Sequence, residues 1–482
     1  MQFNIGSFIF IPLVAVLIMP WASKFSRWAA DVLGLLAGGA LVIVAFSFVP
    51  LGPDVPMPVF KWLDLNLAMD GLSLLFIVTI STVSLLCLLY SINYIDHYGG
   101  RGKFYALLLL MVAGMNGVVL VRDLFSLYLF LEVASIASYV LVAYNLKFDG
   151  IESAFKYLLL SVVATGFILI GIAIIYTSTG TLSFAALRDY LASGLEQRKA
   201  LFLAAAALFF TGFGLKAAVM PFHAWLPDAH PSAPAPISAM LSGVVIKVAG
   251  IYALVRIFYY VYPAPAEIRQ VFMVLGILSM VAGAIIAFYQ DDFKRMLAYS
   301  SISQIGYILI GLGLGSTLGI VGALFHVYNH ALFKSLLFLN SGAVQFRTGT
   351  RSLSEMGGLS ERMRVTSITS VFGSLAISGI PPFNGFFSKL FIIVAAVAAK
   401  QYAVAALLVF ISIFTLGYFL VIQRKAFFGK LNMRWKDIKE VPLGMSLAMI
   451  LLAAQCLLVG VFFNDIVKNL IEPAARILYG GK

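Results

Sequence analysis

The sequence predicts an all-α polytopic membrane protein with about 14 transmembrane helices. Of its 482 residues, 61% are hydrophobic and 11% are charged, whereas about a quarter of the residues in a soluble domain are charged. Apolar runs of about 18 residues, long enough to cross the hydrocarbon core of a bilayer, recur along the whole chain. Short motifs also recur at a nearly constant offset, which indicates a duplicated bundle of helices.

The apolar runs define the order of the expected helices. They cover residues 5–22, 28–50, 70–94, 104–121, 124–145, 153–176, 201–222, 236–260, 270–289, 293–314, 318–345, 365–396, 401–423 and 443–463. The first run lacks the basic segment of a secretory signal, so it predicts a retained helix. Cys87 and Cys456 lie in two separate spans without metal-binding or redox spacing, and we expect both to pack in the core.

The net charge of +12 is unevenly distributed over the connections between spans. Connections that follow odd-numbered spans hold about 17 lysines and arginines, and the others, with the C-terminus, hold about 10. The excess marks the cytoplasmic side, so both termini are expected on the outer side. The densest basic segment, residues 423–440, favours an anchor at anionic lipid headgroups or a docking surface over a nucleic-acid site.

Two lysine-containing motifs recur in the second half of the chain. AFKYLLL is similar to LFKSLLF, which aligns Lys156 with Lys334 at an offset of 178. GFGLK is similar to GFFSK, which aligns Lys216 with Lys389 at an offset of 173. A weaker pair, RDLFSLYLF and DDFKRMLAY, has an offset of about 168.

These motifs pair the sixth span with the eleventh and the seventh with the twelfth. The repeating unit therefore has five helices, namely helices 4–8 and 9–13, and an odd number of crossings places the two copies in opposite orientations. The sequence thus predicts four parts: residues 1–103 with helices 1–3, residues 104–262 with the first repeat, residues 263–430 with the second, and residues 431–482 with a basic loop, helix 14 and a short C-terminal tail.

Both repeated lysines lie beside a predicted break in a helix. Lys216 precedes Pro221 and the stretch HAWLPDAHPSAPAP, whose four prolines cannot continue a helix. Lys389 follows SGIPPFNG, which interrupts helix 12. Interrupted helices of transport proteins line cavities and hold ions near the midplane of the membrane. Helices 7 and 12 are therefore expected to be broken beside candidate sites.

Five charged side chains lie well inside apolar runs, namely Glu132, Lys216, Lys247, Lys334 and Lys389. Each costs about 2.5 to 3.5 kcal/mol at mid-membrane on insertion scales, which argues against an inert role. Burial favours the neutral amine of a lysine and a nearby carboxylate favours the charged amine, so a moving carboxylate can switch a lysine between holding and releasing a proton. We expect Glu132, the only acid in the middle of a span, to pair with Lys216 in a proton relay. A static ion pair between helices 5 and 7 is the structural alternative.

Helix 11 carries His326, His330 and Lys334 at a spacing of four residues. This spacing places the three side chains on one face, where histidines could pass protons between the two halves. The alternative is that the histidines are buried and bonded to the backbone. Lys156 lies nearer a helix end and either joins the relay or extends to the headgroups.

His223 and His230 flank the break in helix 7, with Asp228 between them, and their positions fit either water entry or helix capping. The sequence contains no HExxH motif, cysteine cluster, Walker loop or nucleophile elbow. We therefore expect no cofactor, no metal and no redox site in this chain. The energy for transport would come from a partner or from an ion gradient.

The stretch GFGLKAAVMPFHAWLPDAHPSAPAPISAMLSGVVIKVAGIYAL resembles the central signature of the antiporter-like, proton-translocating membrane subunits. This family is shared by respiratory complex I, the related membrane-bound hydrogenases and Mrp-type multisubunit cation/proton antiporters. HALFKSLLFLNSGAV and GIPPFNGFFSKLFI are similar to the helix 11 and helix 12 motifs of the family. The resemblance implies a 14-helix protein of a prokaryotic cytoplasmic membrane, with two inverted repeats linked by a polar axis.

By motif position, the resemblance assigns seven residues to the family's relay: Glu132 and Lys216 as the helix 5 and 7 pair, Lys247 as the central lysine, His326, His330 and Lys334 as the helix 11 connection, and Lys389 as the terminal switch. Members with glutamate at the last position match less well. So does the largest complex I member, whose long lateral helix has no counterpart in the short stretch after helix 14.

Two functions stay open at this point. The first is a proton-translocating or Na⁺-coupled subunit of a complex I-like redox-driven pump, of the NADH:quinone oxidoreductase or membrane-bound hydrogenase type, in which separate subunits handle electrons. The second is a subunit of an Mrp-type Na⁺/H⁺ antiporter without a redox reaction. A lone permease is a third reading, and the relay argues against it. The first two imply other membrane subunits, including homologous antiporter-like ones, as partners.

Overall fold

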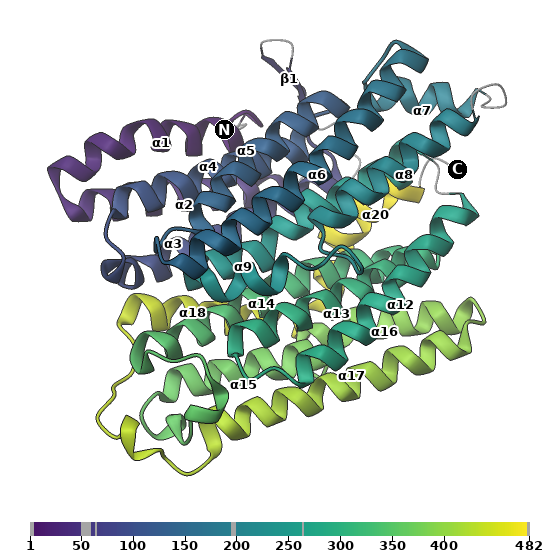
Figure 1. The fold of residues 1–482 in the computed structure, drawn as a ribbon. Helices are drawn as coiled ribbons and strands as arrows, with labels where there is room; N and C mark the ends of the chain where they lie inside the picture. Colours follow the sequence, from purple (N-terminus) through teal and green to yellow (C-terminus); the bar gives the residue numbers. More distant parts are fainter. Residues whose placement is uncertain (1–3, 50–58, 63–64, 194–198, 263–264, 480–482) are drawn as a thin grey trace.

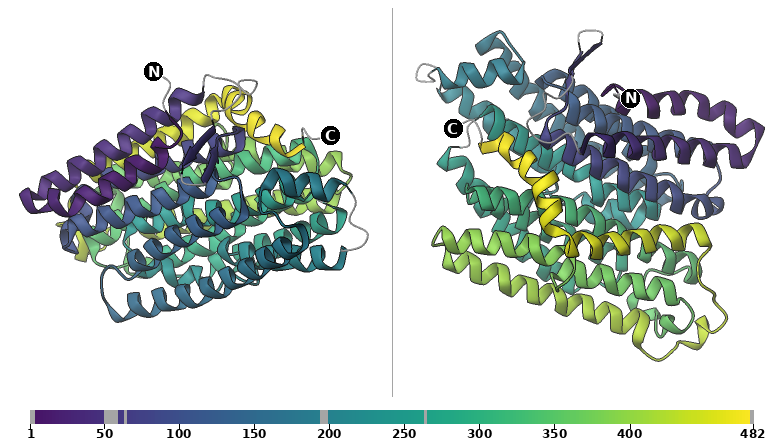
Figure 2. Two further views of the ribbon diagram at one scale, coloured as in Figure 1. Left: turned by 90° about the horizontal axis from the view of Figure 1, so that it is seen from above. Right: turned by 180° about the vertical axis from the view of Figure 1, so that it is seen from behind.

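The computed structural model describes residues 4–49, 59–62, 65–193, 199–262 and 265–479. The axes of its long helices are roughly parallel to one another, and shorter segments connect their ends (Figures 1 and 2). In Figure 1, the helices of the first half of the chain lie above those of the second half, except that the C-terminal helix α20 lies at the height of α8. The predicted helical membrane protein is confirmed at this level.

The first half of the chain contains α1 (Ser7–Phe25), α2 (Arg27–Phe48), β1 (Val59–Trp62), β2 (Leu65–Ala68), α3 (Gly71–Tyr94), η2 (Ile95–His97), α4 (Arg101–Leu120), α5 (Leu124–Val142), α6 (Phe148–Thr179), α7 (Phe184–Ala192), α8 (Lys199–Lys216) and α9 (Leu226–Ser232). The two strands form a small antiparallel hairpin. One long helix follows, built from α10 (Ala235–Met240), η4 (Leu241–Val245), η5 (Lys247–Tyr252), α11 (Ala253–Val255) and η6 (Arg256–Val261). We call this continuous element the central helix.

The second half contains α12 (Ala266–Phe288), α13 (Phe293–Gly313), α14 (Thr317–Thr348), η7 (Leu353–Glu355), η8 (Leu359–Glu361), α15 (Arg364–Ser378), α16 (Asn384–Ala398), α17 (Tyr402–Ile422), η9 (Gln423–Phe428), η10 (Met433–Trp435), α18 (Leu443–Val461), α19 (Phe463–Ile466), η11 (Val467–Ile471) and α20 (Glu472–Tyr479). The predicted C-terminal tail is thus helical, and it crosses behind the bundle toward α3 (Figure 2).

Among the described residues, twelve helices are long and apolar enough to cross a membrane. The difference from the fourteen predicted spans has two causes. The eleventh span corresponds to α14, which has 32 residues but is polar along one face. The twelfth span, residues 365–396, corresponds to two shorter helices, α15 and α16, separated by the Pro-Pro segment. Neither α14 nor the pair α15–α16 therefore has an uninterrupted apolar stretch as long as those of the other spans.

The pair α5–α6 and the pair α13–α14 share one pattern of helix ends. Both α6 and α14 have 32 residues and end at a glycine in the left-handed region, Gly180 at φ 71° and Gly349 at φ 72°. After each glycine the chain returns to the start of the preceding helix: Phe184 N donates to Arg122 O at 3.0 Å, and Leu353 N donates to Asp291 O at 2.9 Å.

Equivalent residues of this pattern share an offset of 169, as Gly180 and Gly349 do. This offset agrees with that of the weakest predicted motif pair. It differs from the alignment of Lys156 with Lys334, because the same offset takes Lys156 to Phe325. The lysine-containing motifs are similar in sequence, but they lie at different heights on their helices.

The two predicted breaks differ in detail. The helix α8 ends at Lys216, and a turn through Ala218, at φ 55°, leads to the short helix α9. The helix α8 is not continued through the four prolines. Pro227 and Pro231 lie instead in the separate short helix α9, where Pro227 takes a first-turn position and its missing N–H leaves no hydrogen bond unmade. The second break separates α15 from α16 and precedes Lys389.

A buried ion cluster joins three parts of the first half. Asp70 caps α3 by accepting from Ser73 N at 2.9 Å. Its carboxylate also pairs with Arg256 of the central helix, at 2.8 and 2.9 Å, and with Arg122 at 3.1 Å. Arg256 is fully buried. Burial alone would raise the pKa of Asp70, but the two guanidinium groups hold it well below its usual value.

We expect Asp70→Asn to destabilise the chain by about 3 to 5 kcal/mol, because removing one partner leaves the Arg256 charge buried and unpaired. Thermal unfolding in detergent measures this as a lower midpoint. Since the pKa of Asp70 is depressed, its contribution is fully present at neutral pH and is lost only as the pH falls through that depressed value. The matched control is Asp96→Asn, whose side chain is 52% exposed in its pair with Arg101. Equal midpoints for the wild type and Asp70→Asn would contradict the assignment.

Candidate functional site

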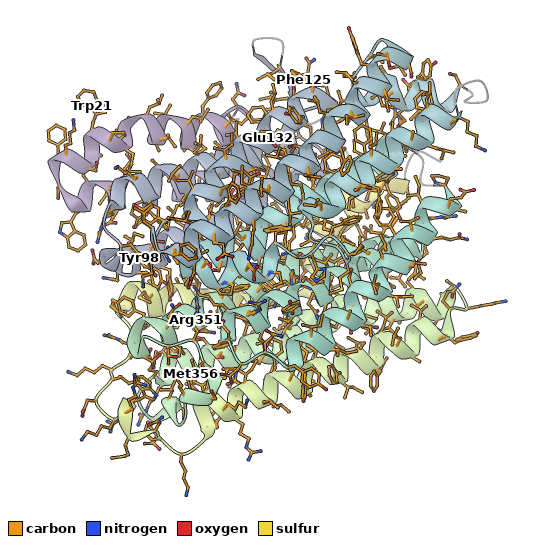
Figure 3. The ribbon with its side chains drawn as sticks, viewed as in Figure 1. Trp21, Tyr98, Phe125, Glu132, Arg351 and Met356 are labelled. Carbon is orange, nitrogen blue, oxygen red and sulfur yellow. The ribbon has the colours of Figure 1, made fainter. Side chains whose placement is uncertain are left out.

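Glu132 and Lys216 form an ion pair between α5 and α8. The distance from Glu132 Oε1 to Lys216 Nζ is 3.7 Å, which confirms the predicted pairing. The Lys216 amine also donates to Ser135 Oγ at 2.8 Å and to Ser161 Oγ. Lys216 is buried, whereas the Glu132 side chain is 25% exposed. The pair therefore has one end in the interior and one end on the flank of the bundle, where Figure 3 labels Glu132.

The local fold explains why Lys216 is held at this point. It is the last residue of α8, and the carbonyl end of a helix favours a positive charge. Trp225, which follows the turn, donates from Nε1 to Leu215 O at 3.0 Å and so closes the end of α8. The Trp225 ring stacks on Tyr157 of α6 at 4.1 Å between centroids. The break therefore packs firmly against α6 beside the amine.

Lys247 lies at the first position of η5 in the central helix and is 1% exposed. Its amine donates to Ser242 O, five residues earlier in the same helix. The segments η4 and η5 are π-helical, and such wide turns occur at functional sites in proteins. Gly250, one turn later, packs on Ala217, and a Cβ at this glycine would lie 2.3 Å from Ala217 Cβ. The central helix thus passes directly beside the end of α8.

The predicted stripe on α14 is fully buried. His326 contacts Ser388 Oγ through Nδ1 at 2.9 Å and Gln304 Oε1 through Nε2 at 3.1 Å. The His330 ring stacks over His326 with 6.2 Å between centroids. Neither ring nitrogen of His330 has a hydrogen-bond partner among the described residues. Because buried polar groups in proteins nearly always have such a partner, His330 differs in this respect from His326 and Lys334 of the same stripe.

Lys334 ends this stripe on the side of α13. Its amine donates to Leu297 O at 2.7 Å and to Ser300 Oγ, both on α13. The central helix packs against α14 beside this stripe, where Ser335 Oγ of α14 donates to Ala239 O of the central helix at 3.3 Å. The central helix, α13 and α14 therefore bring two lysines and two histidines of the prediction into one buried cluster.

Lys389 lies in α16, directly after Ser388, which contacts His326. Its amine reaches back across the second break to Ile377 O at 2.8 Å and donates to Ser412 Oγ of α17 at 3.2 Å. The amine also lies 4.7 Å from the centroid of the Tyr307 ring. A groove of about 330 Å³ opens beside it, lined by residues of α15, α16 and α17. The described part of the chain offers Lys389 no carboxylate within ion-pair distance.

The seven predicted residues thus form two groups. The first is the Glu132–Lys216 pair, and the second contains Lys247, the α14 stripe and Lys389. Contact between the groups is by packing of Ala217 on Gly250. No hydrogen bond among the described side chains joins Lys216 to Lys247, so any proton transfer between them requires water or a movement of the lysines.

The structure places the remaining candidates nearer the surface or beside this cluster. The Lys156 side chain is 48% exposed and pairs with Glu152 at 2.8 Å and with Asp228 at 3.4 Å, which fits the surface alternative. His223 is partly exposed and contacts Pro221 O at 3.3 Å. His230 is buried and stacks on Phe338 at 4.4 Å, one turn beyond Lys334.

Sequence reasoning missed Lys294, which is 1% exposed and donates to Ala233 O at 2.8 Å. Its position two residues after Asp292, at the start of a span, gave no sign of burial. The hydroxyl partners of the lysines were also missed, because serine is inexpensive in a membrane helix and leaves no signal in the composition. Inside a predicted span, a run of polar residues contains Ser300 and Gln304. This run is a sequence signal from which some of these partners could have been identified.

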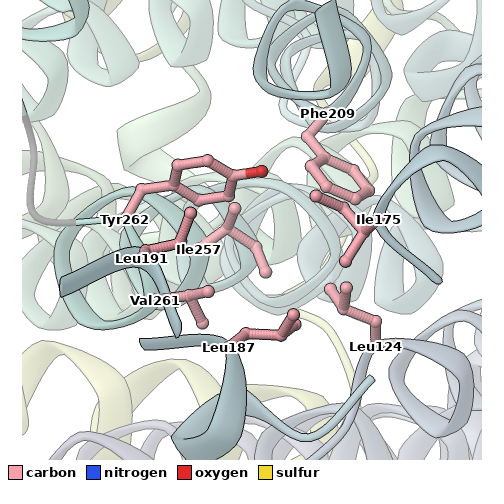
Figure 4. A pocket seen from close by; sticks show the side chains of 8 residues that line it. All are labelled: Leu124, Ile175, Leu187, Leu191, Phe209, Ile257, Val261 and Tyr262. Atoms are coloured by element: carbon pink, nitrogen blue, oxygen red, sulfur yellow. The ribbon is translucent and has the colours of Figure 1, made fainter. Parts of the chain in front are cut away.

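Two other features carry no relay chemistry. A small pocket beside α7 is lined by apolar side chains, with the Tyr262 hydroxyl as its one polar group (Figure 4). Within the described residues, no three His, Cys, Asp or Glu side chains gather as metal ligands would.

Comparison with known families agrees with this geometry. A family model described as "NADH:quinone oxidoreductase/Mrp antiporter, TM" matches residues 121–415. A second, described as "NADH-Ubiquinone oxidoreductase (complex I), chain 5 N-terminus", matches residues 61–105. The first of these covers α5 to α16, which carry all seven predicted residues.

Individual relatives come from different complexes. The chain is 33% identical over 488 residues to NADH-quinone oxidoreductase subunit N of Desulforudis audaxviator, covering 97% of this chain and 96% of the relative. It is 33% identical over 413 residues to one of the Na(+)/H(+) antiporter subunits of Alkalihalophilus pseudofirmus, covering 86% and 83%. A longer protein of the same antiporter is 32% identical over 503 residues, covering 96% of this chain, but the chain spans only 62% of that relative.

Solved structures show the same range of relatives. A chain of the Mrp complex from Dietzia sp. DQ12-45-1b superposes with a TM-score of 0.91 at 27% identity, covering 99% of this chain and 97% of the other. A chain of the membrane-bound sulfane sulfur reductase, an archaeal respiratory membrane complex, gives a TM-score of 0.89 at 28% identity, covering 98% and 97%. The chain therefore belongs to the NADH:quinone oxidoreductase/Mrp antiporter family of membrane subunits.

Proposed function

We propose that this chain translocates protons across the membrane as one subunit of a larger ion-translocating complex. The observation that carries the proposal is the Glu132–Lys216 pair, in which a buried amine lies 3.7 Å from the carboxylate of a partly exposed side chain. Behind it lie Lys247, Lys334 and Lys389, which the described residues hold with carbonyl and hydroxyl oxygens instead of carboxylates. Such weakly compensated amines favour release of a proton once a neighbour can accept it.

In the proposed relay, the position of Glu132 decides whether Lys216 holds its proton. While the carboxylate is close, the charged amine is favoured, and when it moves away only hydroxyl groups remain as hydrogen-bond partners. The released proton passes by water to Lys247 and then to the α14 stripe. The contact of His326 with Ser388 leads it on to Lys389, whose position beside an open groove makes it the exit or the transfer point.

We further propose that the chain crosses the membrane 14 times, with α14 and the broken α15–α16 unit as the additional crossings. Residues 104–262 and 263–430 would form the two five-helix repeats in opposite orientations, with both termini on the outer side. The shared helix ends of α6 and α14 support a duplication. The break beside Lys216 lies in helix 7, and the break beside Lys389 lies in helix 12. A break at the same position in each five-helix unit supports the proposal that these two helices are equivalent.

Two candidate assemblies fit the relatives. A redox-driven pump is supported by the alignment with NADH-quinone oxidoreductase subunit N, which spans 96% of that protein, and by the likeness to an archaeal respiratory membrane complex. An Mrp-type Na⁺/H⁺ antiporter is supported by the TM-score of 0.91 to a chain of the Mrp complex and by 33% identity to one of the Na(+)/H(+) antiporter subunits. We place the redox-driven pump first, because its relative matches this chain over nearly the whole length of both.

The composition of the purified complex separates the two assemblies. We expect an affinity-tagged chain to copurify with iron-sulfur subunits, and proton uptake into vesicles to follow addition of an electron donor. Copurification with small membrane subunits alone, together with proton movement driven by a Na⁺ gradient, would favour the antiporter and remove the first candidate.

Glu132→Gln and Lys216→Gln are each expected to reduce proton translocation by about 100-fold, the scale of losing a positioned proton-transfer group. The complex should still assemble, since each change keeps a polar side chain of similar length. Reconstituted vesicles with a pH-sensitive dye measure the rate. The matched control is Lys156→Gln, which removes an amine from the exposed side of α6 and should transport normally. Full activity of either relay variant would refute the proposal.

His330→Leu is expected to stop proton translocation without loss of stability. The change removes two buried nitrogens that have no partner in the described part of the protein, so the thermal unfolding midpoint should stay equal or rise. It also leaves the α14 stripe without its middle proton acceptor. A transport rate within about twofold of the wild type would show that His330 is a packing residue.

A further inference from the structure

A strongly basic patch covers the connection between α17 and α18. Residues 424–439 contain six exposed cations: Arg424, Lys425, Lys430, Arg434, Lys436 and Lys439. Asp437 is the one exposed acid of this segment. We call these six side chains the basic patch. Figure 3 shows long side chains with nitrogen at their tips projecting outward from this end of the molecule.

Acidic neighbours neutralise only part of the patch. Asp291 lies 3.9 Å from Lys425, but its carboxylate also accepts from Ser352 and Ser354. Burial would raise the pKa of Asp291, whereas these hydroxyls and Lys425 lower it below its usual value, so it stays charged. The adjoining residues 353–364 carry two exposed acids and two exposed arginines, which cancel. The surface therefore keeps a clear excess of positive charge.

The patch is fixed on a rigid support. Trp435 Nε1 and Asn432 Nδ2 both donate to Glu355 O, at 3.1 and 3.0 Å. Gly358, at φ 63°, packs on the chain of the patch so closely that a Cβ would lie 2.4 Å from Leu431 Cα. Only glycine suits both the conformation and this contact. The cations are consequently presented by an ordered segment, which lowers the entropy lost on binding a ligand.

Position and composition place the patch at the membrane boundary. It begins in η9, which continues the membrane helix α17, and it ends before α18, another membrane helix, so only residues 429–442 separate the two. Phe428 and Met433 are 59% and 71% exposed among the cations. Apolar side chains next to lysines and arginines at a helix end fit the layer where headgroups meet acyl chains.

We propose that the basic patch binds the phosphate-bearing headgroups of anionic phospholipids. The charge excess supplies attraction to a negatively charged leaflet, and Phe428 and Met433 supply apolar contact that a soluble acidic partner would not need. Of the two roles that the sequence left open for the basic segment, the proposal therefore assigns lipid binding and not protein docking. The inference does not depend on proton translocation, because none of the six cations belongs to the proposed relay.

Lipid bound here would brace one side of the second break. Glu440, directly after the patch, accepts from Val365 N at 2.7 Å and from Thr366 Oγ1 at 2.6 Å, and so caps α15. Gln423, directly before it, donates to Ser370 and Ser374 of α15 at 2.8 Å. Both ends of the basic segment therefore hold α15, whose last turn carries the carbonyl that binds Lys389.

The test compares lipid binding of three forms of the full chain in detergent, by native mass spectrometry with added phosphatidylglycerol or phosphatidylcholine. The patch variant carries Lys430→Gln, Arg434→Gln, Lys436→Gln and Lys439→Gln. The matched control loses the same charge from exposed lysines elsewhere, with Lys147→Gln, Lys199→Gln, Lys400→Gln and Lys468→Gln. We expect the patch variant to bind phosphatidylglycerol at least tenfold more weakly than the wild type and the control, with equal binding of phosphatidylcholine.

Unchanged binding of phosphatidylglycerol by the patch variant would overturn the proposal. So would loss of a copurifying protein from the patch variant with lipid binding intact, because the patch would then be a protein interface. Displacement of phosphatidylglycerol by millimolar inorganic phosphate would also contradict the proposal, since a free anion would then be enough to occupy the patch. Gel filtration and the thermal unfolding midpoint check that all three forms are folded.

Discussion

The main physical constraint on this structure is the free energy needed to remove charged lysine amines from water. Lys216, Lys247, Lys294, Lys334 and Lys389 are each at most 3% exposed. Among the described residues, Glu132 is the one carboxylate within ion-pair distance of any of them. The rest of the compensation comes from neutral dipoles, which stabilise a charge less than a carboxylate does. The amines are held in place without being fixed in the charged state, and this balance is the property that a proton relay needs.

Irregular backbone supplies many of these dipoles. In a regular helix each carbonyl is engaged by an N–H four residues later, so a carbonyl that binds an amine is found most readily where the helix widens or ends. Lys247 uses Ser242 O in a π-helical segment, Lys294 uses Ala233 O between α9 and α10, and Lys389 uses Ile377 O in the last turn of α15. The breaks and wide turns of the fold are therefore part of the chemistry of the site.

The two flanks of the bundle are unequal, and this inequality suits a chain that works inside a complex. On one flank, Lys216 has its acid, and Glu132 is 25% exposed toward the outside of the bundle. On the other flank, Lys389 has carbonyl and hydroxyl partners and faces an open groove. A charged group contributed by a neighbouring subunit would fit beside Glu132 on one flank and beside Lys389 on the other. The structurally similar chains come from multisubunit membrane complexes.

The sequence by itself determined the membrane location, the order of the spans, the Glu132–Lys216 pair and the place of both breaks, because apolar length, buried charge and proline are strong local signals. The tertiary structure decided what neighbouring helices contribute. It buried Lys294 against Ala233, chose Ser135, Ser161 and Ser300 as partners of the amines, and turned Lys389 back to its break. These contacts join residues far apart in the chain, and a hydroxyl costs too little in a membrane helix to mark its own position in the sequence.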